Sequence, residues 1–326
     1  MPRTVTILGQ DIAPGTSHTL HIDVAPLHTR TPVEAPVFVE RAREEGPVLL
    51  LMGGVHGDEV TGIDIVRRVI REGRHRPRRG TVVCIPVLNI FGFVNLSRAF
   101  PDGRDLNRVF PGSATGSLAS QFASLFRRAV MPAVDVCLDF HSGGAHRRNA
   151  PQTRCVFSDA RGLEIARAFG APFVVQSKYI SKSIREAFMR AGKTAVVFEG
   201  GKSMDFDLPA IHHGVLGVRR VMTHLGMIDP APDLPPAPDR TEVRSSRWLR
   251  APGSGLWHAF AKLGAWVDRG DVIGLLCDPY GGAERPVKAQ WAGFVFCVNT
   301  AAVINRGDAL CHVSVEASGG SPLGAD

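Results

Sequence analysis

From residue 48 to residue 225, short apolar runs alternate with stretches whose apolar residues recur every three or four positions. The run 48–52 is continuously apolar and stops at two glycines, which predicts a buried strand. A helix is expected from about Asp58, because Ile63, Val66 and Ile70 share one face. The alternation continues, with further strands expected over 81–88, 134–140, 172–176 and 194–198, and further helices over 118–130, 163–169, 182–190 and 208–225. This order predicts an α/β fold with a mostly parallel, mixed sheet and helices on both faces.

The alternation ends at a proline-rich segment. Residues 229–239 hold five prolines in eleven positions, which favours an extended spacer. Beyond it, short β-like pieces punctuated by glycine predict a small all-β domain with a barrel-sandwich-like rhythm, similar to biotinyl and lipoyl carriers. No Met-Lys-Met turn presents a lysine, and Lys288 falls within an apparent strand, so a structural cap or an active-site rim is the better interpretation. The expected division is an α/β domain over 1–228, a linker over 229–240 and a β-domain over 241–326.

Bulk charge first suggests an acidic polymer as partner, since 38 Lys and Arg against 31 Asp and Glu give a net charge of +7. Residues 67–79 alone carry seven arginines and one glutamate, which is 7 − 1 = +6 of that total. Aromatic residues do not interleave with these arginines. The stretch is therefore expected to be a solvated helix end, and a nucleic-acid partner is not expected. Apolar runs are too short for a membrane span, and the first residues do not resemble a secretory signal, so a cytoplasmic protein is expected. The six scattered cysteines are expected to be reduced and buried.

Metal-ligand residue types follow three of the predicted strands. His56 and Glu59 form an H-x-x-E pair after the first strand, His141 follows the strand at 134–140, and Glu199 follows the strand at 194–198. The H-x-x-E pair alone also fits a hydrogen-bonded histidine at a helix entry. Candidate ligands after three strands of one sheet are a more specific sign of a metal site than the H-x-x-E pair alone. The carboxyl ends of parallel strands meet at one edge of the sheet, and ligands bind there. They predict a His, His, Glu zinc site with an open position for water, and leave Glu199 as a general base.

A loop over 89–112 adds candidate groups for binding an acid. It carries Arg98, Arg104, Asn107 and Arg108 among glycines, prolines and asparagines. Arginine forks bind carboxylates in bidentate fashion and stabilise an oxyanion. A solvated surface loop explains the same residues equally well.

Four motifs in order now resemble a known family. GGVHGDE, RDLNRVFPG, DFHSGG and VVFEGG are similar to those of the succinylglutamate desuccinylase and aspartoacylase family, within the zinc carboxypeptidase superfamily, over roughly residues 45–228. The resemblance implies a zinc carboxypeptidase-like fold and one Zn²⁺ per chain. The roles it implies are zinc ligand for His56, Glu59 and His141, catalytic carboxylate for Glu199, and substrate-carboxylate binding for Asn107 and Arg108.

The resemblance does not settle the roles of some further side chains. Arg98 is preferred over Arg104 for polarising the scissile carbonyl, because the run around Arg98 looks like that of deacetylases acting on acetylated diaminobutyrate. Arg147 and Arg148 follow His141 closely enough to add acid recognition, although solvated arginines fit as well. Tyr280 is a candidate because aspartoacylase-like proteins use a C-terminal tyrosine, with an ordinary turn residue as the alternative.

The resulting hypothesis is a zinc-dependent amidohydrolase, a deacylase that removes the acyl group of an N-acyl amino acid or related small carboxylate. One alternative keeps the fold and makes the chain a carboxypeptidase acting on short peptides, including cell-wall peptides. Another alternative is a non-catalytic binding or carrier module. The candidate general base Glu199 argues against it, because a protein that only binds needs no general base. The acyl group, the amine and the oligomeric state, including a homo-oligomer, stay open at this point.

Overall fold

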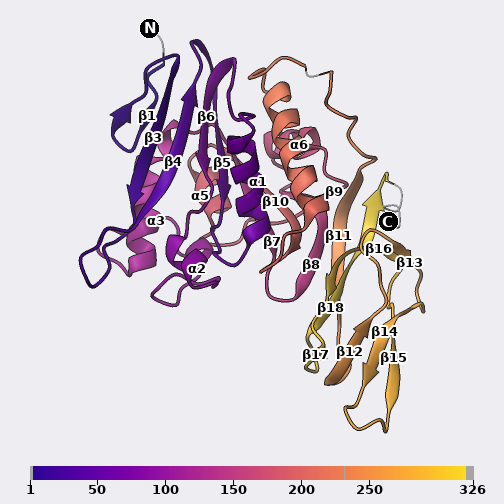
Figure 1. Ribbon diagram of the computed structural model, residues 1–326. Coiled ribbons are helices and arrows are strands. Elements are labelled where there is room, and N and C mark those ends of the chain that lie inside the picture. Colours follow the sequence, from indigo (N-terminus) through magenta and orange to yellow (C-terminus); the bar gives the residue numbers. More distant parts are fainter. Residues whose placement is uncertain (1–2, 231, 321–326) are drawn as a thin grey trace.

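The computed structural model describes residues 3–230 and 232–320 (Figure 1). Its main element is a twelve-stranded mixed sheet in the order β13-β16-β18-β11-β9-β8-β10-β7-β5-β6-β4-β3. The strands before the linker are β3 (Thr16–Asp23), β4 (Glu34–Arg41), β5 (Glu44–Gly53), β6 (Arg79–Ile85), β7 (Val136–Gly143), β8 (Arg147–Cys155), β9 (Phe173–Gln176) and β10 (Thr194–Lys202). A separate hairpin joins β1 (Thr6–Ile7) to β2 (Gln10–Asp11).

Helices cover both faces of this sheet, as predicted. On one face lie α1 (Val60–Arg71), α4 (Ala160–Phe169) and α6 (Leu208–His224), and on the other lie α3 (Leu118–Ala129) and α5 (Ile184–Arg190). The apolar run of β5 explains why both faces need cover. Leu49 and Leu51 join the core beneath α1, while Leu50 and Met52 join the core beneath α3, because successive strand residues point to opposite faces. The short α2 (Ile90–Val94) and two 3₁₀ turns, η1 (Leu106–Arg108) and η2 (Met131–Ala133), lie in the connections.

The C-terminal region is all-β, and it is hydrogen-bonded to the main sheet. β11 (Thr241–Arg250), β13 (Trp266–Val267), β16 (Gly293–Asn299) and β18 (Ala309–Ser318) extend that sheet. A second, four-stranded sheet contains β12 (Gly255–Ala259), β14 (Val272–Cys277), β15 (Glu284–Lys288) and β17 (Val303–Ile304). β11 runs parallel to β9 and β16 runs antiparallel to β8, so two backbone ladders join the region to the α/β part.

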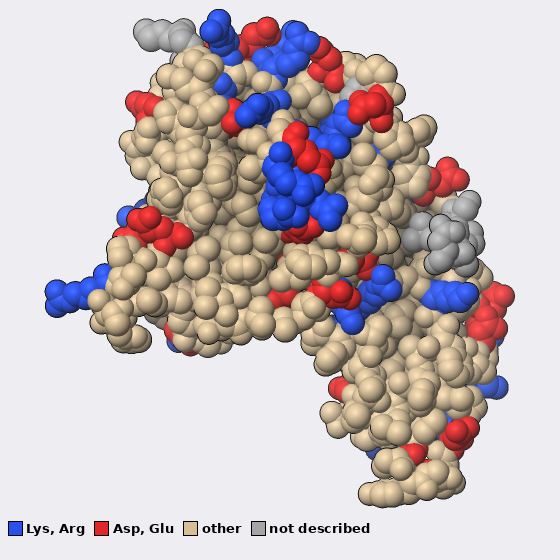
Figure 2. Space-filling model, viewed as in Figure 1, with Lys and Arg blue, Asp and Glu red and all other residues tan. Residues whose placement is uncertain are grey.

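The basic stretch at 67–79 forms the end of α1 and the turn after it. Each of its seven arginines lies within 4.0 Å of an acidic side chain. Figure 2 shows blue and red side chains interspersed over this part of the molecule. The local excess of arginine is therefore largely matched by nearby carboxylates. Within the described residues, no helix combines the length and the apolar character needed to cross a membrane.

Candidate active site

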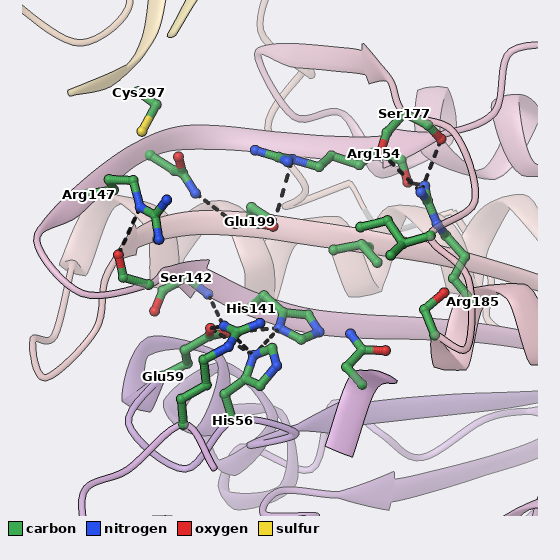
Figure 3. A pocket seen from close by; sticks show the side chains of 18 of the residues that line it. His56, Glu59, His141, Ser142, Arg147, Arg154, Ser177, Arg185, Glu199 and Cys297 are labelled. Carbon is green, nitrogen blue, oxygen red and sulfur yellow. Dashed lines mark hydrogen bonds and ion pairs between the residues drawn. The ribbon is translucent and has the colours of Figure 1, made fainter. Parts of the chain in front are cut away.

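Three neighbouring parallel strands bring the predicted site residues together. β7 lies between β5 and β10, and the C-terminal ends of all three meet at one edge of the sheet. His56 and Glu59 lie between β5 and α1, while His141 on β7 faces Glu199 on β10 in the strand register. One donor atom from each of His56, Glu59 and His141 lies within 4.8 Å of the others. All four residues line a single pocket, shown in Figure 3.

The glycine between the two ligands of the H-x-x-E pair is required by packing. A Cβ atom at Gly57 would lie 1.9 Å from the carbonyl carbon of Gly92 in α2, which is a severe overlap with backbone. The Gly57 amide also donates to the carbonyl of Ser97 at 3.1 Å. The loop that carries His56 and Glu59 is therefore held against α2 at a distance that only glycine allows.

The three donor residues converge on one point. Glu59 places one carboxylate oxygen 2.8 Å from Nδ1 of His56 and the other 2.8 Å from Nδ1 of His141. The two Nδ1 atoms are themselves 3.2 Å apart. The backbone amide of Ser142 donates to Glu59 at 3.1 Å and fixes the carboxylate.

Two further carboxylates set the tautomers of the histidines. Nε2 of His56 lies 3.1 Å from Asp105, and Nε2 of His141 lies 2.9 Å from Asp139. A carboxylate beside Nε2 keeps the proton there and leaves the Nδ1 lone pair free, as is usual for metal-binding histidines. When both rings are neutral, two nitrogen lone pairs and one carboxylate face the same point, so this donor set fits a divalent cation. The sequence analysis did not assign these roles to Asp105 and Asp139.

The electrostatics of the buried cluster agree with that fit. Burial opposes ionisation of Glu59, but the two histidines hold the pKa of its carboxyl well below the usual range. Burial would likewise lower the pKa of both histidines. Glu59 and Asp105 instead raise the pKa of His56, and Asp139 and Glu59 raise that of His141. The carboxylates thus make this site favourable for positive charge, which a bound cation would supply.

Glu199 lies at the same pocket with its side chain 19% exposed. Asn149 donates from Nδ2 to Oε2 of Glu199 at 2.7 Å. Nε of Arg154 lies 3.7 Å from the other carboxylate oxygen, at ion-pair distance. Both partners come from β8, which pairs with β10, so the backbone ladder holds them beside Glu199.

The loop over 89–112 contributes three of its four candidates to the pocket. Arg98 donates from Nη1 to Glu59 at 3.1 Å and from Nη2 to Asp105 at 2.9 Å, so its guanidinium borders the donor cluster. Asn107 and Arg108 also line the pocket, and Oδ1 of Asn107 accepts from the Ile184 amide at 2.9 Å.

Three other candidates are not brought to this pocket. Arg104 turns toward Asp102, with 3.5 Å between the charged atoms. Arg148 pairs with Asp207 at 2.8 Å, whereas its neighbour Arg147 does line the pocket. Tyr280 is 94% exposed in the turn between β14 and β15, at the far tip of the C-terminal region in Figure 1. The expectation that it reaches the site is therefore not supported by this structure.

The pocket also contains residues that the sequence analysis missed. Arg154, Ser177, Ile180, Ser183 and Arg185 line it from β8, α5 and the segment before α5, and Trp248 and Cys297 line it from β11 and β16. The indole of Trp248 stacks on the ring of His312, with centroids 4.1 Å apart and an interplanar angle of 13°. Burial and the charge of Arg154 lower the pKa of His312 to about 3, so this ring is neutral. The C-terminal strands thus form one wall of the pocket.

A family model described as the succinylglutamate desuccinylase/aspartoacylase catalytic domain matches residues 45–225. The chain belongs to this family. A curated relative, the N-alpha-acetyl-L-2,4-diaminobutyric acid deacetylase of Halomonas elongata, is 32% identical over 297 residues, which cover 86% of each chain. Membership of this family, together with the His-Glu-His triad, makes the chain a deacylase-type hydrolase.

Solved structures support the same assignment. A succinylglutamate desuccinylase/aspartoacylase from Rhodobacter sphaeroides is 28% identical with a TM-score of 0.80, and the match covers 91% of this chain and 95% of that one. The product-bound ectoine utilization protein EutE (DoeB) from Ruegeria pomeroyi is 25% identical with a TM-score of 0.80, covering 92% and 95%. An aspartoacylase family protein from Mesorhizobium loti is 26% identical with a TM-score of 0.80, covering 99% of both chains. The mixed α/β fold with its C-terminal all-β region is therefore the fold of these relatives.

Proposed function

We propose that the chain is a zinc-dependent deacylase that hydrolyses the amide bond of a small N-acyl amino acid. The observation that carries this proposal is the convergence of His56, Glu59 and His141 beside a partly exposed Glu199 in one arginine-lined pocket. The name of the Halomonas relative supports an N-acetyl amino acid as the first substrate to test.

The donor set of two imidazole nitrogens and one carboxylate favours Zn²⁺ among the common biological cations. His56, Glu59 and His141 would hold a zinc ion, which would supply Lewis acidity and lower the pKa of the attacking water toward ~7. Asp105 and Asp139 then contact the Nε2 atoms of the two histidines, on the side away from the donor atoms, and keep both imidazoles in the required tautomer.

The protein's own groups divide the remaining work. Glu199, oriented by Asn149, accepts the proton of the attacking water and later delivers it to the leaving amine nitrogen. Arg98 donates to the acyl oxygen as negative charge develops there, since its guanidinium borders the donor cluster. Asn107 and Arg108 bind the carboxylate of the amino-acid part, which aligns the amide bond.

Metal analysis combined with one substitution tests this proposal. Purified protein is expected to hold about one zinc per chain and to release acetate from N-α-acetyl-L-2,4-diaminobutyrate or another N-acetyl amino acid. Glu199→Gln is expected to keep the zinc and to lose activity by a factor of at least ~10². Wild-type turnover in this variant, or full activity after the metal is removed, would contradict the mechanism.

The same assay separates the deacylase from a carboxypeptidase. Trp248 and Cys297 place side chains of the C-terminal strands in the pocket wall, which supports a small substrate over an extended peptide. A set of N-acetyl amino acids is therefore expected to be turned over faster than dipeptides and tripeptides. Faster hydrolysis of the peptides would favour the carboxypeptidase instead.

A further inference from the structure

A second hollow lies on the face of the sheet that carries α3 and α5, behind the strands in Figure 1. Its volume is about 430 Å³, within the range of roughly 300–1,000 Å³ that is typical of small-molecule sites. Every residue that lines it differs from those that line the active-site pocket. Most of its lining is apolar, and this part comprises Phe110, Pro111, Met131, Pro132, Ala187 and Ala191.

Helix α5 lies between the two pockets. Ser183, its N-cap, and Arg185 line the active-site pocket, whereas Ala187, Arg190 and Ala191 line the second hollow. The last three residues share one face because they are three and four positions apart. This face is short of cover, since Ala191 is exposed, and the prolines opposite it are exposed as well. An apolar hollow that is open to solvent is typical of a binding site for a ligand or a partner.

Charged side chains stand around this apolar lining. Arg190 and Glu186 both line the hollow and pair with each other at 3.0 Å, so their charges cancel. Arg127 also lines it, and its Nε donates to the Pro111 carbonyl at 3.2 Å. Among the described residues, no carboxylate lies within 4.0 Å of the Arg127 guanidinium. The charge of Arg127 is therefore not balanced by a direct ion pair.

Lys193 adds a second unbalanced cation. Its Nζ donates to the Pro132 carbonyl at 2.9 Å and to the Val134 carbonyl, which orients the ammonium without neutralising it. No carboxylate of the described chain lies within ion-pair distance of this ammonium. Burial outweighs the attraction of the more distant Asp135 and lowers the pKa of Lys193. The hollow thus combines an apolar lining with two cations that lack an opposite charge.

We propose that this hollow is a second ligand site, which binds a small apolar carboxylate. The apolar body of such an acid covers the exposed Pro111, Pro132 and Ala191, and removing this surface from water is favourable. Its carboxylate supplies the opposite charge that Arg127 and Lys193 lack. A neutral ligand would leave both cations unbalanced, and a small inorganic anion would leave the apolar lining open to water. The site is independent of the proposed deacylase function, because different residues line the two pockets.

Two matched probes test the site. The zinc-loaded protein is titrated calorimetrically with octanoate and with octanamide, a neutral molecule of nearly the same shape. Octanoate is expected to bind about tenfold more tightly than octanamide. Arg127→Gln should weaken octanoate about tenfold and leave octanamide nearly unchanged, because it removes the charge and keeps the lining. Ala191→Trp should weaken both probes at least about tenfold, because the indole fills the hollow.

Two control substitutions lie on the same helices and outside the hollow. Arg128→Gln removes an exposed arginine of α3 whose Nε donates to the Ser124 carbonyl at 3.2 Å. Met189→Trp places the same ring on α5, at a position that is 39% exposed. Both are expected to keep the wild-type affinity for each probe. Absence of saturable octanoate binding, equal affinity for the two probes, or undiminished octanoate binding in either Arg127→Gln or Ala191→Trp would overturn the proposal.

Discussion

Removing the amide of Asn149 tests how Glu199 is held for proton transfer. Asn149 is 4% exposed, and its Nδ2 donates to Glu199 at 2.7 Å. Among the described residues this is the one hydrogen bond to the Glu199 side chain, since Arg154 lies farther away, at 3.7 Å. In Asn149→Ala, the carboxylate loses this bond and can rotate away from the position in which it takes the proton.

The size of the effect follows from the type of bond. A hydrogen bond to an ionised group contributes about 1.5–3 kcal/mol, and each 1.4 kcal/mol corresponds to about a tenfold change in rate. Water can enter the open pocket and replace part of the lost bond, so the lower end of that range applies. We therefore expect kcat to fall about tenfold, with KM changed less than about twofold because the carboxylate-binding groups stay in place.

Initial rates of amine release from an N-acetyl amino acid, together with zinc content, measure this effect. Asn95→Ala is the control, because it removes an exposed amide whose one side-chain bond among the described residues is to the Phe91 carbonyl at 3.0 Å. In a Glu199→Gln background, Asn149→Ala should cost little further, because the two residues act as a unit. A kcat within twofold of wild type, or full additivity of the two losses, would refute the reasoning.

Four further outcomes are expected. Chelation of the metal should abolish activity and lower the thermal midpoint, and added zinc should restore both. Gly57→Ala should weaken zinc binding at least about tenfold in a chelator competition, because its Cβ would overlap the backbone of Gly92; unchanged affinity would show that the loop can shift. Phe169→Ala should lower the free energy of unfolding in urea by about 3–5 kcal/mol, since this ring is fully buried. Glu242→Gln should lower it by about 1 kcal/mol at pH 7, because Arg167 binds both carboxylate oxygens at 2.8 and 2.9 Å from a partly screened position. Hydrogen bonds from Arg167 hold the pKa of Glu242 below its usual range, so this contribution is present above pH ~4.3 and should vanish as the pH falls through the lower folded-state pKa.

The central strands and the metal site could be predicted because one physical rule links them. A strand buried on both faces is continuously apolar, so the segment that became β5 is visible in the sequence, and likewise β7 and β10. Ligands at the carboxyl ends of such strands meet at one sheet edge whatever their separation along the chain. His56, His141 and Glu199 can therefore be recognised as site residues from the sequence alone.

Strand β8 was missed because its sequence lacks the apolar run of a core strand, since several of its residues line the pocket. It reads Arg147 to Cys155 with three arginines, an asparagine and a proline, and some of these polar side chains line the site. The edge strand β3 was also missed, since six of its eight residues are polar and only Ile22 is buried. Trp248 and Cys297 could not have been assigned, because their place in the pocket depends on the pairings of β11 with β18, of β18 with β16 and of β16 with β8.

Tyr280 shows the limit of an argument from resemblance. Asp278 accepts from the amide of Tyr280 at 2.8 Å and also from that of Ala283, which closes a tight turn at the tip of the hairpin. The ring then faces solvent far along the C-terminal region. That aspartoacylase-like proteins use a C-terminal tyrosine does not determine which way this hairpin points, and the alternative of an ordinary turn residue fits the structure.

The ladder between β8 and β16 sets the size of molecule that the enzyme can accept. Cys297 pairs with Asn149, which in turn holds Glu199, so the wall stands two strand spacings from β10, or roughly 10 Å. Widening this gap would require breaking backbone hydrogen bonds along a continuous sheet, unlike a hinge that opens between loosely joined domains. Enlarging the range of substrates therefore means trimming side chains on that wall, and Trp248 is the first position at which to attempt it.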